Sequence, residues 1–450
     1  MKTRRQFLKS CRNLAVTGAA GGFTRLGRMS ALAATTTGYR GLVCIFLFGG
    51  NDNNNTIAPI TGQAYTDYQN ARRSLAIPQA QLRSIAASGG RTFGLHPRLT
   101  GIQSLYQQNK AALLLNVGML VQPIVKSDLN TAGLTPRNLY SHSDQTAQWQ
   151  AANPNGPAGT GWAGRVADIM QFGNAGSILP AISVNGNALQ LTGSSTRPLT
   201  VTPGARLGLA GLGDPTADQL RDSTMPQILT FDTGVSLIAS ASGILGSALR
   251  NAAAVNTALD GAPALPTVFP NTGIGRQLAQ VAKVVSARVG LQMNRQIFFC
   301  GLGGFDNHSN LLTNHDNLLG ELDAAMSAFY AATVAMGVAN DVTTFTESEF
   351  GRTLDGNSTN GSDHAWGSNH IIVGGSVRGA EVYGTMPTLR LGGPDDAGDR
   401  GLFIPTTSLD QYGATLASWF GVTGAGELDT VFPNLVHFTT KTLAFLPPAA

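Results

Sequence analysis

Three strand-like runs of this sequence break off into glycine-rich polar corners, and this repeated pattern constrains the fold more than any other feature. Two runs are continuously apolar, and the third is rich in β-branched and aromatic residues; they cover residues 41–48, 296–301 and 342–346. Such runs are typical of parallel strands buried on both faces of a sheet. Because ligands bind at the carboxyl ends of strands in open α/β sheets, we expect the three corners to meet at one sheet edge.

The corners carry carboxylates and imidazoles, the side chains that bind metals and transfer protons. The candidate metal ligands are Asp52, Asp306, His308, Glu349 and His364. This ligand chemistry favours zinc, manganese or iron over calcium, and zinc or manganese is the expected divalent ion. The structural alternative is that Glu349 caps a helix and pairs with Arg352.

The rest of the sequence predicts an α/β fold with a mostly parallel central sheet flanked by helices. Apolar residues at helical spacing indicate helices over 274–288 and 314–337, on either side of the 296–301 strand, as in a right-handed crossover unit. A further covering helix is expected over 409–420. Residues 186–270 are rich in glycine, alanine and serine and are expected to form a loop-rich cap or insertion beside the sheet.

The amino terminus has the pattern of a twin-arginine export signal. Thr3-Arg4-Arg5-Gln6-Phe7-Leu8-Lys9 is followed by a weakly apolar stretch and by Ala31-Leu32-Ala33, a small-residue cleavage site. We therefore expect residues 1–33 to be a signal peptide and residues 34–450 to be the mature domain. The expected location is periplasmic or secreted, with the twin-arginine translocase as the export partner.

Removing that segment changes the charge of the chain. Residues 1–33 hold seven basic and no acidic residues, so the formal charge of +4 becomes −3 for residues 34–450. No basic run remains, which disfavours nucleic-acid binding. No apolar run reaches the roughly 18 residues of a membrane span, so none is expected in the mature form. Cys44 and Cys300 lie inside strand candidates and are expected to be buried free thiols, although a disulfide stays open if the two strands pair.

Seven segments, in order along the chain, together resemble a known family. They are Gly49–Asp52, Tyr140–Asp144, Gly161–Arg165, Phe305–His308, Glu349–Arg352, Gly361–His364 and Gly374–Gly379. The chain resembles the secreted bacterial family called domain of unknown function fifteen-oh-one, which is grouped with the alkaline phosphatase and sulfatase-like superfamily. The resemblance implies an alkaline-phosphatase-like α/β hydrolase with two metals, acting on phosphate or sulfate esters, or a phosphoryl-transferring relative.

The resemblance also implies roles for individual residues. Asp52 matches the first metal aspartate, Asp306 and His308 match a later ligand pair, and His364 matches the final histidine ligand, with Asp363 joining it or orienting it. Two departures stand out. Phe350 replaces a histidine ligand, which would deplete one of the two metal sites, and the sulfatase signature Cys/Ser-x-Pro-x-Arg is absent from the sequence.

The nucleophile and the substrate clamp follow less directly from the sequence. Ser141 is the candidate nucleophile, with Ser143 as the alternative, although the neighbouring His142 does not by itself make a dyad because adjacent side chains on a strand point to opposite faces. Arg165 and Arg352 could hold an anionic oxygen of the substrate in a bidentate manner, or pair with nearby carboxylates.

The sequence therefore predicts a metal-dependent hydrolase of a phosphate or sulfate ester, acting on a small molecule or a polymer. The alternative is a non-catalytic pseudo-hydrolase that keeps the fold and binds a partner or an envelope polymer; Phe350 and the unassigned nucleophile favour it. A redox protein is suggested only by the export route, since no Rossmann glycine fingerprint or haem-attachment motif occurs.

Overall fold

A computed structural model describes residues 38–156, 158–174, 180–207, 215–231, 234–424 and 426–449. The expected signal peptide lies outside these residues. A nine-stranded sheet forms the centre of the molecule. Its strands, in spatial order, are β11 (Glu381–Tyr383), β5 (Ala111–Gly118), β10 (Ser368–Gly374), β9 (Val342–Glu347), β1 (Arg40–Leu47), β8 (Arg295–Leu302), β6 (Ala181–Ser183) and β7 (Leu199–Thr200), and β12 (Thr407–Ser408) pairs with β5.

The three strands that end in polar corners lie side by side, as the sequence predicted. β1 pairs in parallel with β9 on one side and with β8 on the other. Phe46 lies opposite Glu347, and Leu47 lies opposite Leu302, so the carboxyl ends of the three strands are level. β10 is antiparallel to both β9 and β5. The sheet is therefore mixed and mostly parallel, and its central corners meet at one edge.

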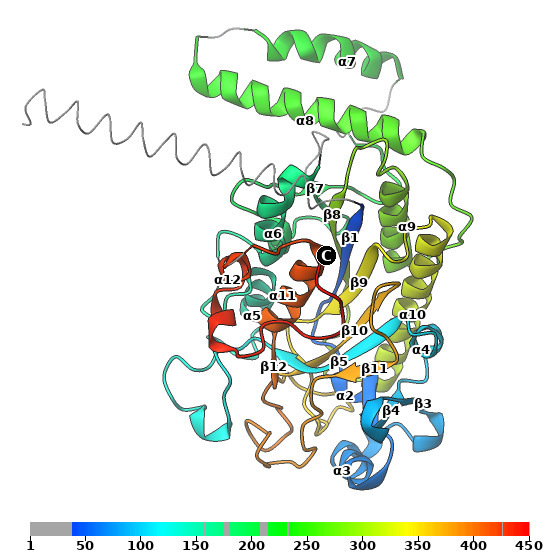
Figure 1. The fold of residues 1–450 in the computed structure, drawn as a ribbon, viewed down its shortest axis with the longest axis vertical. Helices are drawn as coiled ribbons and strands as arrows, with labels where there is room; N and C mark the ends of the chain where they lie inside the picture. The colour runs from blue at the N-terminus through cyan, green and yellow to red at the C-terminus, as the bar shows by residue number, and fades with distance from the viewer. Residues whose placement is uncertain are drawn as a thin grey trace, which may run out of the picture.

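Helices cover both faces of this sheet (Figure 1). One face packs against α4 (Thr100–Gln107), α9 (Gly273–Ser286) and α10 (Leu311–Ala335). The other packs against α5 (His142–Ala151), α6 (Trp162–Met170), α11 (Leu409–Phe420) and α12 (Glu427–Val431). The predicted helices over 274–288, 314–337 and 409–420 are thus confirmed, with ends that differ by less than one turn.

Local sequence explains why two of these helices start where they do. The Thr272 hydroxyl caps α9 by accepting a hydrogen bond from Gly275 N at 3.1 Å, and Leu278, Val281 and Val285 form its buried stripe. Ser408 and Gln411 form a capping box at the start of α11. Each helix therefore enters the core with a satisfied amino terminus.

A smaller antiparallel sheet flanks the corner after β1. It consists of β2 (Ile57–Pro59), β4 (Thr92–Leu95) and β3 (Arg83–Ala86). Two helices belong to the same part of the chain: the short α2 (Asn53–Thr56) precedes β2, and α3 (Gly62–Arg72) follows it. These elements follow Asp52 directly and decide which way its side chain turns.

The region expected to be a cap or insertion contributes to two parts of the structure. Its strand β7 joins the edge of the main sheet through β6. Its helices α7 (Pro215–Leu229) and α8 (Ser236–Asp260) lie at one end of the molecule, beyond the sheet (Figure 1).

Cys44 and Cys300 are both free and buried. They lie on adjacent strands, but Cys44 is opposite Phe299 whereas Cys300 is opposite Ile45. Their side chains therefore enter different core clusters on opposite faces of the sheet. The disulfide left open by the sequence is not formed. Across the described residues, every helix is too short or too polar to cross a membrane.

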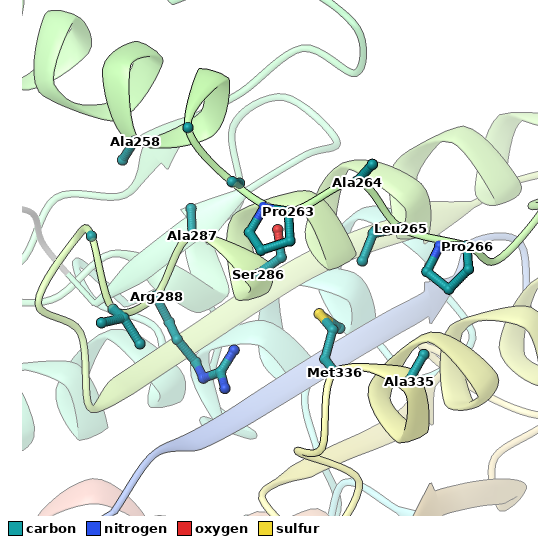
Figure 2. A pocket seen from close by; sticks show the side chains of 14 residues that line it. Ala258, Pro263, Ala264, Leu265, Pro266, Ser286, Ala287, Arg288, Ala335 and Met336 are labelled. Carbon is teal, nitrogen blue, oxygen red and sulfur yellow. The ribbon is translucent and has the colours of Figure 1, made fainter.

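A cavity of about 590 Å³ lies at the edge of the sheet opposite the polar corners. Its walls come from the residues after α8, from the end of α9 just before β8, and from the end of α10 (Figure 2). Arg288 is the one charged side chain among the residues that line it. This cavity contains none of the predicted site residues.

Candidate metal centre

Glycine permits the close approach of the corners that build the site. Gly49 has φ of 113°, and a Cβ atom placed there would lie 2.4 Å from the backbone nitrogen of Asp306. The Gly49 N–H donates to Glu349 Oε1 at 2.8 Å. The corners after β1 and β8 thus touch through backbone atoms, which only glycine allows at this position, and the corner after β9 joins them through the Glu349 carboxylate.

Three histidine rings converge on one carboxylate oxygen. His142 is the first residue of α5, His308 follows β8, and His364 precedes β10. The Nε2 atoms of His142 and His364 each lie 3.3 Å from Asp306 Oδ1, and His308 Nε2 lies 3.0 Å from it. His308 Nε2 and His364 Nε2 are 3.0 Å apart.

The other nitrogen of each ring is held by an oxygen. His142 Nδ1 lies 2.9 Å from Glu349 Oε1, and His308 Nδ1 lies 2.9 Å from Asp363 Oδ1. His364 Nδ1 lies 2.7 Å from the carbonyl oxygen of Tyr140. Carbonyl and carboxylate oxygens can only accept, so each Nδ1 carries a hydrogen and each neutral ring presents a lone pair at Nε2.

Backbone strain accompanies one of these contacts. Tyr140 has φ of 71°, an uncommon conformation for an aromatic residue. Its carbonyl oxygen is the acceptor that fixes the His364 ring. Strained residues of this kind persist where the surrounding structure requires them, often at functional sites.

The cluster brings acceptor atoms together without enough donors between them. The lone pairs of His308 and His364 face each other, and His142 Nε2 is buried without a hydrogen-bond partner. Acceptors at such distances repel one another unless a cation lies among them. Ligands about 2.0–2.1 Å from a tetrahedral metal are separated by roughly 3.3 Å, which matches the spacing found here. The side chains present therefore fit a metal ion.

The pKa shifts favour a neutral His364 and an ionised Asp306, whereas the raised pKa of His142 favours the protonated ring. Burial lowers the pKa of His364, and the hydrogen bond to Tyr140 opposes this only in part. The hydrogen bond to Glu349 raises the pKa of His142 against the effect of burial. Burial alone would raise the pKa of Asp306, but Arg352 and the nearby histidines lower it to about 2.

His142, Asp306 and His364 also form a group that could hold a metal ion, because their ligand atoms all lie within 4.8 Å of one another. The structure thus brings together three of the five predicted ligands, Asp306, His308 and His364. It adds His142, which the sequence analysis did not predict as a ligand. The signal for His142 was its place in the Tyr140–Asp144 segment, one of the seven that carried the family resemblance.

The predicted ligand Asp52 has a different role in the structure. Its carboxylate forms a buried ion pair with Arg72, the last residue of α3, and the two side chains are 2% and 0% exposed. Arg72 also donates to the carbonyl oxygen of Thr353 at 3.1 Å. Because α2 begins directly after Asp52, the chain turns its carboxylate toward α3, and Arg72 is its one charged partner among the described residues.

Glu349 lies behind a ligand and does not take a ligand position itself. One carboxylate oxygen accepts from both Gly49 N–H and His142, and the other accepts from the Ser348 hydroxyl at 3.3 Å. Both carboxylate oxygens are therefore engaged, and the contact of Oε1 with Nδ1 orients the His142 ring. The helix-capping alternative is also wrong, since Glu349 follows a strand and caps no helix.

The two arginines predicted to clamp substrate are structural. Arg352 is 1% exposed and donates to the backbone oxygens of Gly50 and Ser362, each at 2.9 Å, and to Asp306. It thereby ties the three corners together. Arg165 donates to the carbonyl oxygens of Ala151 at 2.7 Å and Val431 at 2.6 Å, which joins α5 to α12. Neither guanidinium is free to bind an anion.

Ser141, the candidate nucleophile, caps a helix. Its hydroxyl lies 2.6 Å from Asp144 Oδ2 and accepts from Asp144 N–H at the start of α5. The alternative Ser143 is exposed and lies 3.2 Å from Ser141 through the two hydroxyl oxygens. No described contact of either hydroxyl reaches Asp306 or the three histidine rings.

Phe350 occupies the position where a histidine ligand was expected. Its ring stacks on His364 with centroids 4.8 Å apart, and its centroid is also 4.8 Å from that of His142. The ring is fully buried. Phe350 therefore supports two of the imidazoles through packing, in place of a second set of ligands.

A cavity of about 630 Å³ opens beside the metal centre. Its walls are Phe48, Gly49, His142, Ser143, Thr146, Ala147, Gln150, Asn187, Leu189, Asp306 and Glu349. A cavity of this size can hold a small-molecule ligand. The candidate metal centre thus forms one wall of a space that a substrate could occupy.

The profile of a protein family matches residues 39–395 of this sequence, and the family is described as "Protein of unknown function (DUF1501)". The chain belongs to this family. The match covers every strand of the main sheet except β12, and all seven segments of the predicted resemblance. Curated protein sequences gave no match to the chain.

Solved structures give weaker likenesses to this member of the DUF1501 family. A sulfatase from Pseudoalteromonas sp. is 10% identical, and the match covers 81% of this chain and 68% of that chain with a TM-score of 0.30. A 2-O GAG sulfatase is 9% identical, with 88% and 75% covered and a TM-score of 0.33. A variant of an alkaline phosphatase is 10% identical, with 70% and 64% covered and a TM-score of 0.26.

Proposed function

We propose that this protein is a metal-dependent hydrolase of phosphate or sulfate esters, with one divalent ion held by His142, His308, His364 and Asp306. The observation that supports it best is the convergence of three imidazole lone pairs on one carboxylate oxygen. Each ring is fixed through its other nitrogen, as in metal sites whose outer partners orient the ligands. Zinc or manganese suits this set of nitrogen and oxygen ligands.

The chain's own residues would prepare this site for an ester. A bound ion would act as a Lewis acid toward the ester group. Glu349, Asp363 and the Tyr140 carbonyl hold the imidazole rings in one tautomer, so that Nε2 is free to bind. The buried Arg352 donates a hydrogen bond to Asp306 and so fixes the orientation of its carboxylate. The cavity beside His142 would receive the rest of the ester.

We propose a single metal, although the superfamily resemblance implies two. The carboxylate of Asp52 is already paired with Arg72, and the aromatic ring of Phe350 replaces an expected ligand. Because Ser141 serves as a helix cap, we further propose that water attacks the ester directly, without a covalent serine intermediate.

A second candidate is a pseudo-hydrolase that keeps the fold and binds a partner or an envelope polymer. The observation that favours it is the same loss of Asp52 and Ser141 to structural contacts. Under this alternative the histidine cluster would bind a metal for stability or not bind one at all. The two candidates differ in whether a bound ion supports ester hydrolysis.

Metal analysis of the purified protein, combined with hydrolysis of 4-nitrophenyl phosphate and 4-nitrophenyl sulfate, tests the proposal. We expect close to one equivalent of zinc or manganese and hydrolysis that a chelator abolishes. His364→Ala should lose both, whereas His437→Ala, which changes an exposed histidine outside the site, should lose neither. A metal-loaded protein that hydrolyses neither ester would favour the pseudo-hydrolase, and a folded protein that binds no metal would overturn the metal centre.

We also propose that the protein is exported by the twin-arginine route and acts in the periplasm or outside the cell. Replacing both Arg4 and Arg5 with lysine should leave unprocessed precursor in the cytoplasm, because the paired arginines form the export signal. Cell fractionation followed by immunoblotting measures this. A mature periplasmic form in a strain without the twin-arginine translocase would show another route.

A further inference from the structure

The cavity beside the metal centre has a wall without positive charge. Its acidic members are Asp306 and Glu349, and no lysine or arginine is among the residues that line it. Two arginines contact carboxylates of the site, but neither lines the cavity: Arg352 is buried beneath Asp306, and Arg400 lies 2.6 Å from Asp363. The cavity therefore offers no lysine or arginine to an anion that lies outside the metal centre.

Neutral hydrogen-bonding groups take the place of cations in this wall. Thr146 and Asn187 both line the cavity, and Asn187 is exposed. Neither side chain forms a hydrogen bond with another described residue, so a hydroxyl and an amide remain available to a ligand. Gln150 lies beside them, and its side-chain oxygen accepts from Gln190 N–H at 3.1 Å.

Phe48 and Leu189 add an apolar surface to the same cavity. Both are only partly buried, so they present carbon atoms to whatever enters. A few polar groups placed within an apolar lining give orientation to a bound small molecule. A ring that bears hydroxyl groups fits such a wall, since its C–H surface can lie on the apolar side and its hydroxyls can reach the amide and hydroxyl groups.

We infer that the alcohol part of the ester is an uncharged, hydroxyl-rich group, such as a neutral sugar or polyol, without a second anionic group. This inference rests on the proposed function, because it places the reacting phosphate or sulfate at the metal centre. The lining supports it: Asp306 is already paired with Arg352 and Glu349 already contacts His142, and no lysine or arginine lines the wall, so a second anion would lose its water without gaining a cationic partner.

A pair of esters that differ in one charge tests this inference on the metal-loaded full chain. Glucose 1-phosphate and glucuronic acid 1-phosphate share a ring and a reacting group, but the second carries an added carboxylate. If the 4-nitrophenyl assay shows sulfatase activity, the corresponding sulfates replace them. We expect kcat/KM for the glucose ester to exceed that for the glucuronate ester by about tenfold or more, since the added carboxylate would lose its water without meeting a cation.

A charge substitution in the cavity should move this ratio. Asn187→Lys adds a cation to the wall at an exposed position where no side-chain hydrogen bond is lost, and it should shift the ratio of the two kcat/KM values toward the glucuronate ester by about tenfold. Asn155→Lys, which adds the same charge at an exposed position outside the cavity lining, should leave the ratio unchanged.

The outcomes separate this inference from the proposed function. Hydrolysis of the 4-nitrophenyl ester reports on the proposed function, whereas the ratio of the two sugar esters reports on the inference. Equal or better hydrolysis of the glucuronate ester by the unmodified protein would overturn the inference, as would hydrolysis of the 4-nitrophenyl ester alone. An unchanged ratio in folded Asn187→Lys would do the same. If Asn187→Lys does not fold, the ratio of kcat/KM for the two sugar esters in the unmodified protein still tests the inference.

Discussion

Asp52 and Asp306 follow neighbouring parallel strands, and each is paired with a buried arginine, yet the structure gives them different roles. The Asp52 side chain is 2% exposed and lies against Arg72, whereas the Asp306 side chain is 48% exposed and faces three imidazoles as well as Arg352. A position at the carboxyl end of a strand therefore does not by itself make a metal ligand. Two features distinguish Asp306 from Asp52: Asp306 contacts three imidazole rings in addition to its arginine, and it lines a cavity.

The elements that follow each strand account for the difference. After β1 the chain enters α2, the small sheet and α3 at once, and these elements enclose Asp52. After β8 the chain remains a loop until α10 begins at Leu311, so Asp306 and His308 stay accessible. The corner after β1 thus became structural, and the corner after β8 remained open for chemistry.

The largest expected effect comes from removing an imidazole that faces the open corner after β8. His364→Ala removes a proposed ligand and the ring that stacks on Phe350. We expect metal content to fall to background and ester hydrolysis to fall by at least about a hundredfold, more than the 10–100-fold typical of outer-shell changes. Metal analysis and steady-state kinetics measure both. If His364→Ala kept both the metal and the activity, the claim that the open corner holds the metal centre would be wrong.

The closed corner should respond through stability instead. Arg72→Met leaves the buried carboxylate of Asp52 without its partner, and such a change typically costs about 3–5 kcal/mol of unfolding free energy. Urea denaturation measures this, and the folded fraction should still bind one equivalent of metal. Loss of metal from well-folded Arg72→Met would show that Asp52 belongs to the site after all.

Glu349 follows β9, the neighbour of β1 on the side away from β8, and its replacement should give an intermediate effect. Glu349→Ala removes the acceptor that orients His142, and we expect metal affinity to weaken by about 10–100-fold, since outer-shell partners contribute at this level. Glu349→Gln keeps an oxygen near His142 and should recover part of the loss. Competition with a chromophoric chelator measures the affinity. Equal affinity of all three proteins would contradict a positioning role.

The smallest expected effect is a change with pH in the stability of the metal-free protein. The pKa of Asp306 is lowered from 3.8 to about 2, so its ion pair with Arg352 contributes stability above pH 3.8 that is lost as the pH falls through 2. Asp306→Asn should therefore be less stable than the unmodified protein at neutral pH, and the two should converge between pH 4 and 2. Thermal unfolding across this range, with metal removed, measures the difference. A constant difference down to pH 2 would mean that the ionised pair contributes nothing.

Much of the fold could be predicted because it depends on local patterns. Continuous apolar runs indicated buried parallel strands, and their glycine-rich ends indicated one common edge; β9, β1 and β8 lie together as expected. The antiparallel direction of β10 could not be predicted, since hydrophobicity does not encode the direction in which a strand enters the sheet.

The site was predictable only in part, because local sequence patterns do not specify how distant helices pack against the strand ends. Asp306, His308 and His364 follow or precede recognisable strands, so their place at the edge could be expected. His142 starts a helix far from them in sequence, and only tertiary packing brings α5 against the strand ends. The pairing of Asp52 with Arg72 depends likewise on how α3 packs, which the sequence pattern does not specify.

Anomalous diffraction from crystals of the protein grown with zinc tests the central claim most directly. We predict a single peak at the zinc edge, with an ion about 2.0–2.2 Å from the Nε2 atoms of His142, His308 and His364 and from a carboxylate oxygen of Asp306. The Asp52–Arg72 pair should remain intact in the same map. An ion bound to Asp52, or no ion among the three histidines when zinc is in excess, would contradict the account.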